Sequence, residues 1–124
     1  MNVVDSSAWL EYFADGPNAE QFAQPIEQPQ ALLVPSITLF EVFKRVVQQR
    51  DEGAALQCVA VMQQGTVVDL DAVVALDAAG LSLRHKLPLA DSIVYATALR
   101  GNAVLWTQDA DFDGLPGVRY FAKA

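Results

Sequence analysis

Short apolar segments alternate along this chain with stretches that have the length and polarity of helices, and this alternation restricts the fold strongly. The expected strands cover residues 1–5, 31–34, 66–69, 103–106 and 118–121. The expected helices cover residues 7–14, 17–27, 36–50, 52–64, 71–85 and 88–100. Ser36 and Asp71 are expected to cap their helices, Gly101 to end the last helix, and Pro25 and Pro29 to bracket a loop. Strands that alternate with helices are typical of a parallel sheet covered on both faces. The sequence therefore predicts an α/β fold with three layers, α/β/α, around a central parallel sheet of four to five strands.

The size and composition of the chain favour one compact unit. Its 124 residues fit a single domain, 1–124, and 52% of them are hydrophobic, which is enough to form a core. No stretch approaches the roughly 20 apolar residues of a membrane span. The first residues lack a basic leader, and Cys58 is the only cysteine, so an internal disulfide and a zinc–thiolate cluster are excluded. We therefore expect a soluble cytoplasmic protein.

Four acidic residues occur where such a fold would gather them. Asp5 ends the first expected strand and Asp109 follows the fourth. Asp91 lies in the first turn of the last helix, and Glu41 interrupts the apolar segment ITLFEVF. Ligands of open parallel sheets bind outside the carboxyl ends of the strands, where these carboxylates would meet. Two unit charges about 4 Å apart repel by about 4 kcal/mol at an effective dielectric near 20. This repulsion predicts a bound cation, and an all-oxygen site favours Mg²⁺ or Mn²⁺ over zinc.

Each of the four acids also has a simpler structural explanation. Asp5 could cap the helix that follows it, and Glu41 could form an ion pair one helical turn away. Asp91 could interact with the dipole of its own helix, and Asp109 could cap a turn. The prediction of a site therefore depends on the four positions together.

Four short segments of the chain carry a resemblance to a known family. In order, they are VDSSAWLEYF, LFEVFKR, LPLADSIVYATAL and VLWTQDADF. Together they resemble the PIN-domain ribonucleases, and in particular the small VapC-type toxins of bacterial toxin–antitoxin pairs. The resemblance covers essentially the whole chain. It implies a PIN-like fold and an Mg²⁺- or Mn²⁺-dependent endoribonuclease that hydrolyses RNA phosphodiester bonds, leaving a 5′-phosphate and a 3′-hydroxyl.

The resemblance also implies roles for individual residues. The catalytic and metal-binding acids of the family match Asp5, Glu41, Asp91 and Asp109. A supporting acid in the same turn as the last of these matches Asp111. The polar residues that orient the carboxylates match Ser6 and Thr107.

The net charge of −7 argues at first against a nucleic-acid partner, because proteins that bind phosphates are usually basic. Two divalent cations would add 4 charges and leave −3 (−7 + 4). The basic residues are also grouped, with Lys44 next to Arg45. Arg84, Lys86 and Arg100 are candidate RNA contacts, and a solvated surface is their alternative role. Charge alone therefore does not exclude an RNA substrate.

The resemblance further implies two protein partners. One is a small antitoxin that wraps the toxin and blocks its acidic cleft, and the other is a second copy in a homodimer. Trp9, Tyr12 and Phe13 are expected in the core, with part of this aromatic edge available to a partner.

Two other classes of protein remain as alternatives. A phospho-receiver domain has similar length, acidity and fold class, but it needs an acidic pair after the first strand and a lysine after the fifth. Here Asp5 is followed by Ser6, and the only late lysine is Lys123. The second alternative is a non-catalytic interaction module that uses the PIN fold as a scaffold.

Overall fold

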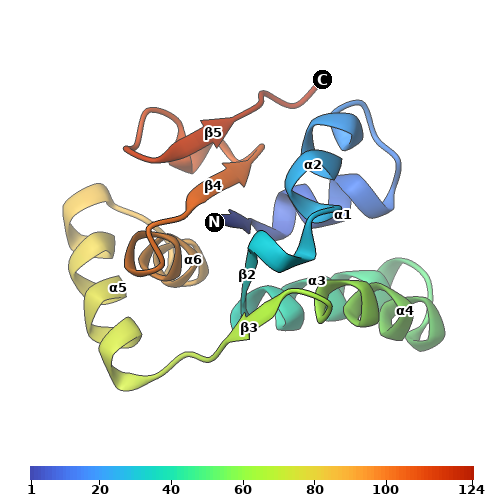
Figure 1. Ribbon diagram of the computed structural model, residues 1–124, viewed down its shortest axis with the longest axis horizontal. Helices are drawn as coiled ribbons and strands as arrows, with labels where there is room; N and C mark the ends of the chain where they lie inside the picture. The colour runs from blue at the N-terminus through green and yellow to red at the C-terminus, as the bar shows by residue number, and fades with distance from the viewer.

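The computed structural model describes residues 1–124 and contains five strands and six α-helices (Figure 1). The strands are β1 (Asn2–Val4), β2 (Leu32–Pro35), β3 (Thr66–Val68), β4 (Val104–Thr107) and β5 (Val118–Tyr120). The α-helices are α1 (Ser6–Phe13), α2 (Ala19–Ile26), α3 (Ser36–Gln49), α4 (Glu52–Met62), α5 (Ala72–His85) and α6 (Leu89–Arg100). Two 3₁₀ turns, η1 (Pro29–Ala31) and η2 (Ala110–Phe112), complete the chain.

All five strands are parallel and lie in the order β3-β2-β1-β4-β5. The central strand β1 therefore pairs with β2 on one side and with β4 on the other. In phospho-receiver domains the order is 2-1-3-4-5, which places the third strand beside the first. The observed order excludes that alternative. It also places the ends of β1 and β4 side by side, because Val4 is in register with Trp106.

Two hydrophobic cores lie on the two faces of the sheet, and consecutive residues of a strand point into different ones. Val3 belongs to the core that α5 and α6 cover, whereas Val4 belongs to the core under α1 to α4. In β4, Leu105 and Trp106 divide in the same way. Figure 1 shows the two groups of helices on opposite sides of the sheet. The predicted three-layer α/β fold is confirmed. None of the helices is long and apolar enough to cross a membrane.

The structure differs from the sequence-based expectation at Pro25 and at the start of α3. Pro25, which was expected at the boundary between a helix and a loop, lies inside α2, where it is buried. It occupies the last turn of the helix, so its missing N–H removes only one hydrogen bond. Ser36 was expected to cap α3, but it is the first helical residue and makes no capping bond. Pro35 precedes it, and its carbonyl accepts a 2.7 Å hydrogen bond from Thr38 Oγ1.

The ends of α5 and α6 agree better with expectation. Asp71 caps α5 by accepting a hydrogen bond from the Val74 amide at 2.9 Å. Gly101 ends α6 as predicted, but the left-handed residue is Asn102, with φ of 50°. Gly101 is needed for packing instead, because a Cβ there would collide with the Leu33 side chain of β2.

Candidate metal centre

Asp5 lies at the carboxyl end of the central strand and is 2% exposed. Although it precedes α1, its side chain makes no capping bond. Its Oδ2 instead accepts hydrogen bonds from Ser7 Oγ at 2.6 Å and Thr107 Oγ1 at 2.7 Å. Burial raises the pKa of the Asp5 carboxyl above its usual range, while these hydroxyl donors act in the opposite direction. The simple capping explanation of Asp5 is therefore wrong.

Glu41 reaches the same end of the sheet from α3. Its Oε1 accepts a 2.9 Å hydrogen bond from Ser6 Oγ, which also lies 3.4 Å from Asp5 Oδ1. Glu41 forms no ion pair, since the only one in the structure joins Arg100 to Asp77. Burial raises the pKa of Glu41, and the charges of Asp5 and Asp109 add to the effect, whereas the Ser6 hydroxyl lowers it.

Three further aspartates complete the cluster. Asp91, Asp109 and Asp111 each offer a carboxylate oxygen, and these oxygens lie within 4.8 Å of one another. The pKa of Asp91 rises from 3.8 to about 8, first through burial, then through the charges of Asp109 and Asp5, and also through a hydrogen bond with Asp111. Two hydrogen bonds hold Asp109 in place. Its backbone N–H donates to Thr107 Oγ1 at 2.9 Å, and its side chain accepts from the Asp111 amide at 2.9 Å.

The structure thus brings the four predicted acids into one electrostatically coupled group, with Asp111 at its exposed edge. Every donor in it is oxygen, which suits a hard divalent cation. Burial first, and the neighbouring carboxylates second, raise the pKa values of Asp5, Glu41 and Asp91, so the ionised forms of these three groups are destabilised. A bound cation reverses this effect, because its charge favours the deprotonated ligands. The residues present therefore fit Mg²⁺ or Mn²⁺.

Hydroxyl groups hold the cluster together, and Ser7 is one that sequence reasoning missed. Besides its bond to Asp5, its Oγ lies 3.5 Å from Thr107 Oγ1 and accepts a 3.4 Å hydrogen bond from the Gln108 amide. The Gln108 side chain in turn accepts from Asn18 Nδ2 at 3.1 Å. The one sequence signal for Ser7 is its place in the Asp-Ser-Ser run after β1.

The three basic residues suggested for RNA contact lie on α5, on α6 and between them. Arg84 and Arg100 line a shallow groove between α5 and α6, where Arg100 donates to Asp77 at 3.0 Å. Lys86 follows α5 in the left-handed conformation. Arg100 lies nine positions after Asp91 on α6, which corresponds to roughly 13 Å along the helix axis. Arg100 therefore lies at the other end of this helix from the acids.

Two other basic residues lie next to one of the acids. Lys44 and Arg45 follow Glu41 by one helical turn, and the three residues share a shallow surface with Phe40. Phe40 is 59% exposed, and Lys44 Nζ lies 5.6 Å from the centroid of its ring.

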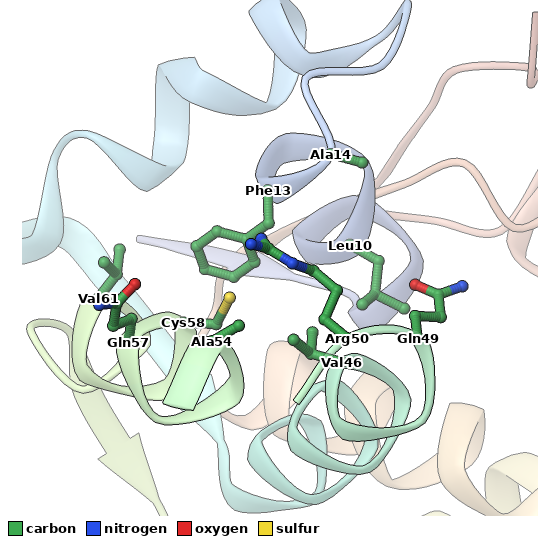
Figure 2. Close-up of a pocket in the computed structure, with 10 residues that line it drawn as sticks. All are labelled: Leu10, Phe13, Ala14, Val46, Gln49, Arg50, Ala54, Gln57, Cys58 and Val61. Carbon is green, nitrogen blue, oxygen red and sulfur yellow. The ribbon is translucent and has the colours of Figure 1, made fainter. Parts of the chain in front are cut away.

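A separate apolar groove of about 320 Å³ lies between α1, α3 and α4. Figure 2 shows Leu10 and Phe13 from α1 facing Val46 of α3 and Cys58 of α4, with Arg50 extending across the opening. Trp9 is fully inside the core, whereas Phe13 lines the groove. The aromatic edge expected near a partner surface is thus divided between the core and this groove.

The family model of the PIN domain matches residues 3–118 of the chain. Among solved structures, a toxin–antitoxin complex from Klebsiella pneumoniae has a TM-score of 0.83 at 22% identity, with 100% of each chain covered. A sarcin-ricin loop cleaving VapC toxin from Mycobacterium tuberculosis has a TM-score of 0.80 at 17% identity, over 95% of this chain and 97% of the other. A DNA-bound VapBC complex from Salmonella typhimurium reaches 0.72 at 17% identity, over 98% of both chains. No curated protein matches. At these identities, the likeness to solved structures establishes the fold alone.

Proposed function

Because this chain belongs to the PIN domain family and has the fold of VapC toxins, we propose that it is the toxin of a toxin–antitoxin pair and cleaves RNA as a metal-dependent endoribonuclease. The observation that carries the proposal is the convergence of Asp5, Glu41, Asp91 and Asp109 from separate elements onto the carboxyl end of β1 and β4. Acids with purely structural roles do not need to be gathered in a place where burial and neighbouring charges raise the pKa values of Asp5, Glu41 and Asp91, whereas carboxylates that share a bound cation must lie close together. The substrate would be a cytoplasmic RNA.

The four acids, with Asp111, would hold Mg²⁺ or Mn²⁺. When bound, such a cation supplies an activated water and offsets the charge that develops on the attacking and leaving oxygens of the phosphodiester. The chain's own contribution is to fix the carboxylates. Ser7 and Thr107 both bind Oδ2 of Asp5, so Oδ1 keeps only the longer contact with Ser6 and is the oxygen free for a cation. Ser6 also orients Glu41.

Lys44, Arg45 and Phe40 would bind the RNA strand next to the acids. Cationic side chains beside the cleft attract the phosphates that flank the cleaved bond. An exposed aromatic ring such as Phe40 can stack on an unpaired base, as in many proteins that recognise single-stranded RNA. Arg84, Lys86 and Arg100 remain candidate contacts, and Arg100 is already paired with Asp77.

The antitoxin would occupy the apolar groove of Figure 2. Solved structures with this fold include toxin–antitoxin complexes. An amphipathic helix is the usual occupant of an apolar groove between helices. The groove and the acids share two helices, since Leu10 of the groove lies four residues after Ser6 on α1 and Val46 lies five residues after Glu41 on α3. A peptide that leaves the groove toward the first turns of these two helices would approach the acids.

The nuclease proposal is tested by incubating a structured RNA pool with Mn²⁺ or Mg²⁺, with and without EDTA. Wild type is compared with Asp91→Asn and with Asp69→Asn, an exposed strand-end acid outside the cluster, all purified identically. We expect metal-dependent cleavage by wild type and Asp69→Asn and none by Asp91→Asn. Equal cleavage by all three proteins would reveal a contaminating ribonuclease. No cleavage by any of them, with no growth arrest on expression, would favour the non-catalytic module.

The groove is tested by growth in the presence of a co-expressed antitoxin. Val61→Asp places a charge in the groove, whereas Leu56→Asp changes another exposed residue of α4 outside it. We expect Val61→Asp to stay toxic and Leu56→Asp to be neutralised. Neutralisation of both variants would contradict the assignment of the groove.

A further inference from the structure

Most of the polar side chains that the protein buries belong to one hydrogen-bond network that ends at Asp5. The buried polar residues are Asp5, Asn18, Thr38, Ser92, Thr97, Thr107 and Gln108. The side chains of Thr38, Ser92 and Thr97 only donate to a carbonyl three or four residues earlier in the chain. The other four residues are connected by hydrogen bonds between distant segments, either directly or through Ser7.

Asn18 is the outer end of this network, and it lies at the N-cap position of α2 without capping the helix. Asparagine is preferred at this position because its side chain can accept a hydrogen bond from the first turn. Here the side chain makes no such bond. Its Nδ2 donates instead to Gln108 Oε1 at 3.1 Å and to the carbonyl of Ala122, after β5, at 2.9 Å. Figure 1 shows this last segment of the chain beside α2.

The loop between α1 and α2 holds Asn18 firmly against α1. The backbone N–H of Asn18 donates to Glu11 Oε2 at 2.8 Å. Gly16 leaves room for this bond, because a Cβ at Gly16 would collide with the Glu11 carboxylate. The backbone of Asn18 is therefore anchored, and both hydrogens of its side-chain amide are used, so the side chain has one preferred direction.

Gln108, which receives this side chain, lies between two residues of the candidate metal centre. Thr107 before it donates to Asp5 Oδ2, and Asp109 after it is one of the converging acids. The backbone N–H of Gln108 donates to Ser7 Oγ at 3.4 Å. Because Ser7 Oγ accepts this bond, its single hydrogen is left for Asp5 Oδ2, at 2.6 Å. A displacement of Gln108 would therefore disturb both hydroxyl donors to Asp5.

We propose that Asn18 is a positioning residue for the candidate metal centre, which it affects by holding Gln108 and so fixing residues 107–109. The inference rests on the proposed metal-dependent function, since the direction of the Asp5 carboxylate matters most when it must hold a cation. Asn18 itself binds none of the five acids of the cluster. No buried side-chain atom of the network lacks a partner, and a network that is paired in this way rigidifies its surroundings. An apolar pair would fill the same space but would fix no direction.

Two variants break the bond between Asn18 and Gln108 from opposite ends. Asn18→Leu has nearly the same volume and removes the donor, whereas Gln108→Met has nearly the same length and removes the acceptor. The double variant leaves neither partner of this bond unpaired, so it should regain part of the stability that each single variant loses. The control Thr97→Val removes a buried hydrogen bond that lies outside the network. Circular dichroism checks that each variant is folded.

Amide hydrogen exchange of the full chain in EDTA, followed by NMR, measures the positioning without metal or RNA. The amides of residues 108 and 109 report on the segment beside Asp5, and the amide of Val94, buried in α6, reports on global opening. Both single variants should speed exchange at 108 and 109, relative to Val94, by at least about fivefold, which is the effect of losing one hydrogen bond. The double variant should show the same ratio, because both changes break one bond. Thr97→Val should leave the ratio unchanged.

Calorimetric titration of Mn²⁺ into the same proteins then measures the effect on the cation. We expect Kd to rise about 10-fold in Asn18→Leu and in the double variant, the lower end of the range for groups that orient metal ligands, and to stay unchanged in Thr97→Val. A purely structural role would instead restore the affinity in the double variant together with its stability.

Two results would overturn the proposal. They are exchange ratios that stay at the wild-type value in the folded single variants, and a double variant that binds Mn²⁺ as tightly as wild type does. A wild type that binds no Mn²⁺ would refute the proposed function, and the exchange ratios would still decide whether Asn18 positions residues 107–109. The two failures are therefore distinguishable.

Discussion

Replacing Asp91 by asparagine should make the metal-free protein more stable, although it removes a residue proposed to be essential for catalysis. Asp91 is held in a half-buried position where Asp109 and Asp5 oppose its charge, and its pKa is raised from 3.8 to about 8. The folded protein therefore holds this proton more tightly than the unfolded chain does. The stability that this provides is complete below about pH 4 and is lost as the pH rises through about 8. Asparagine has nearly the same shape and does not ionise.

The size of the effect follows from the pKa. Each pKa unit corresponds to about 1.4 kcal/mol, so the full difference between 3.8 and about 8 would be about 6 kcal/mol. Asp91 keeps part of its surface in water, which screens its charge, and its neighbours share the titration, so we expect about 1–3 kcal/mol. For a chain of this length, about 1 kcal/mol changes Tm by about 4 °C. Asp91→Asn should therefore melt about 4–12 °C above wild type at pH 8.5 in EDTA.

Thermal melts of both proteins across pH 4.5–8.5 in EDTA test this expectation. The difference in Tm should be small at the acid end and grow as the pH rises. Saturating Mg²⁺ should then raise the free energy of unfolding of wild type, by about 2.7 kcal/mol at 100 times Kd. It should have little effect on the stability of the variant. If the two proteins have the same Tm at every pH, the acids do not repel one another in solution, and the reasoning about the cluster fails.

Two further predictions concern the hydroxyl groups. Ser6→Ala removes the hydrogen-bond donor that lowers the pKa of Glu41, so the acid limb of the pH–rate profile for RNA cleavage should move to higher pH. Ser6→Thr keeps a hydroxyl and should leave the acid limb in place. An unchanged acid limb in Ser6→Ala would contradict the role of this hydrogen bond. Thr107→Val leaves Asp5 Oδ2 and the Asp109 amide each with one partner fewer and should lower the free energy of unfolding by about 1–3 kcal/mol, as measured by urea denaturation. Thr107→Ser keeps the hydroxyl and should retain most of that stability, so an equal loss in both variants would show that only the methyl group matters.

The gathering of the acids could be predicted from the sequence because it depends on the direction of the strands. The carboxyl ends of parallel strands share one edge of a sheet, so acids that follow two strands meet if those strands are neighbours. Asp5 and Asp109 follow β1 and β4, which pair directly. Asp91 at the start of α6 and Glu41 on α3 required only that these helices begin at the same edge. The α/β class and most element boundaries followed from periodicity in the same way.

Other features depend on contacts that the sequence does not display. Asp5 has the sequence context of a helix cap, and only the position of Thr107 on the neighbouring strand shows that its oxygen is used differently. The capping role expected of Ser36 failed for a similar reason, since tertiary packing overrides local preference. The placement of basic residues relative to the acids depends on the direction of each helix. Lys44 and Arg45 are therefore near the cleft, whereas Arg100 is at the far end of α6.

Calorimetric titration of Mn²⁺ into the protein at pH 7.5 tests the central claim most directly, because it measures the site without needing to know the RNA. Wild type is compared with Asp91→Asn and with Asp69→Asn, which removes an exposed acid outside the cluster. If the converging acids form a metal centre, wild type and Asp69→Asn will bind with the same saturable heat and Asp91→Asn will bind weakly or not at all. Equal binding by all three proteins, or no binding by wild type, would contradict the claim.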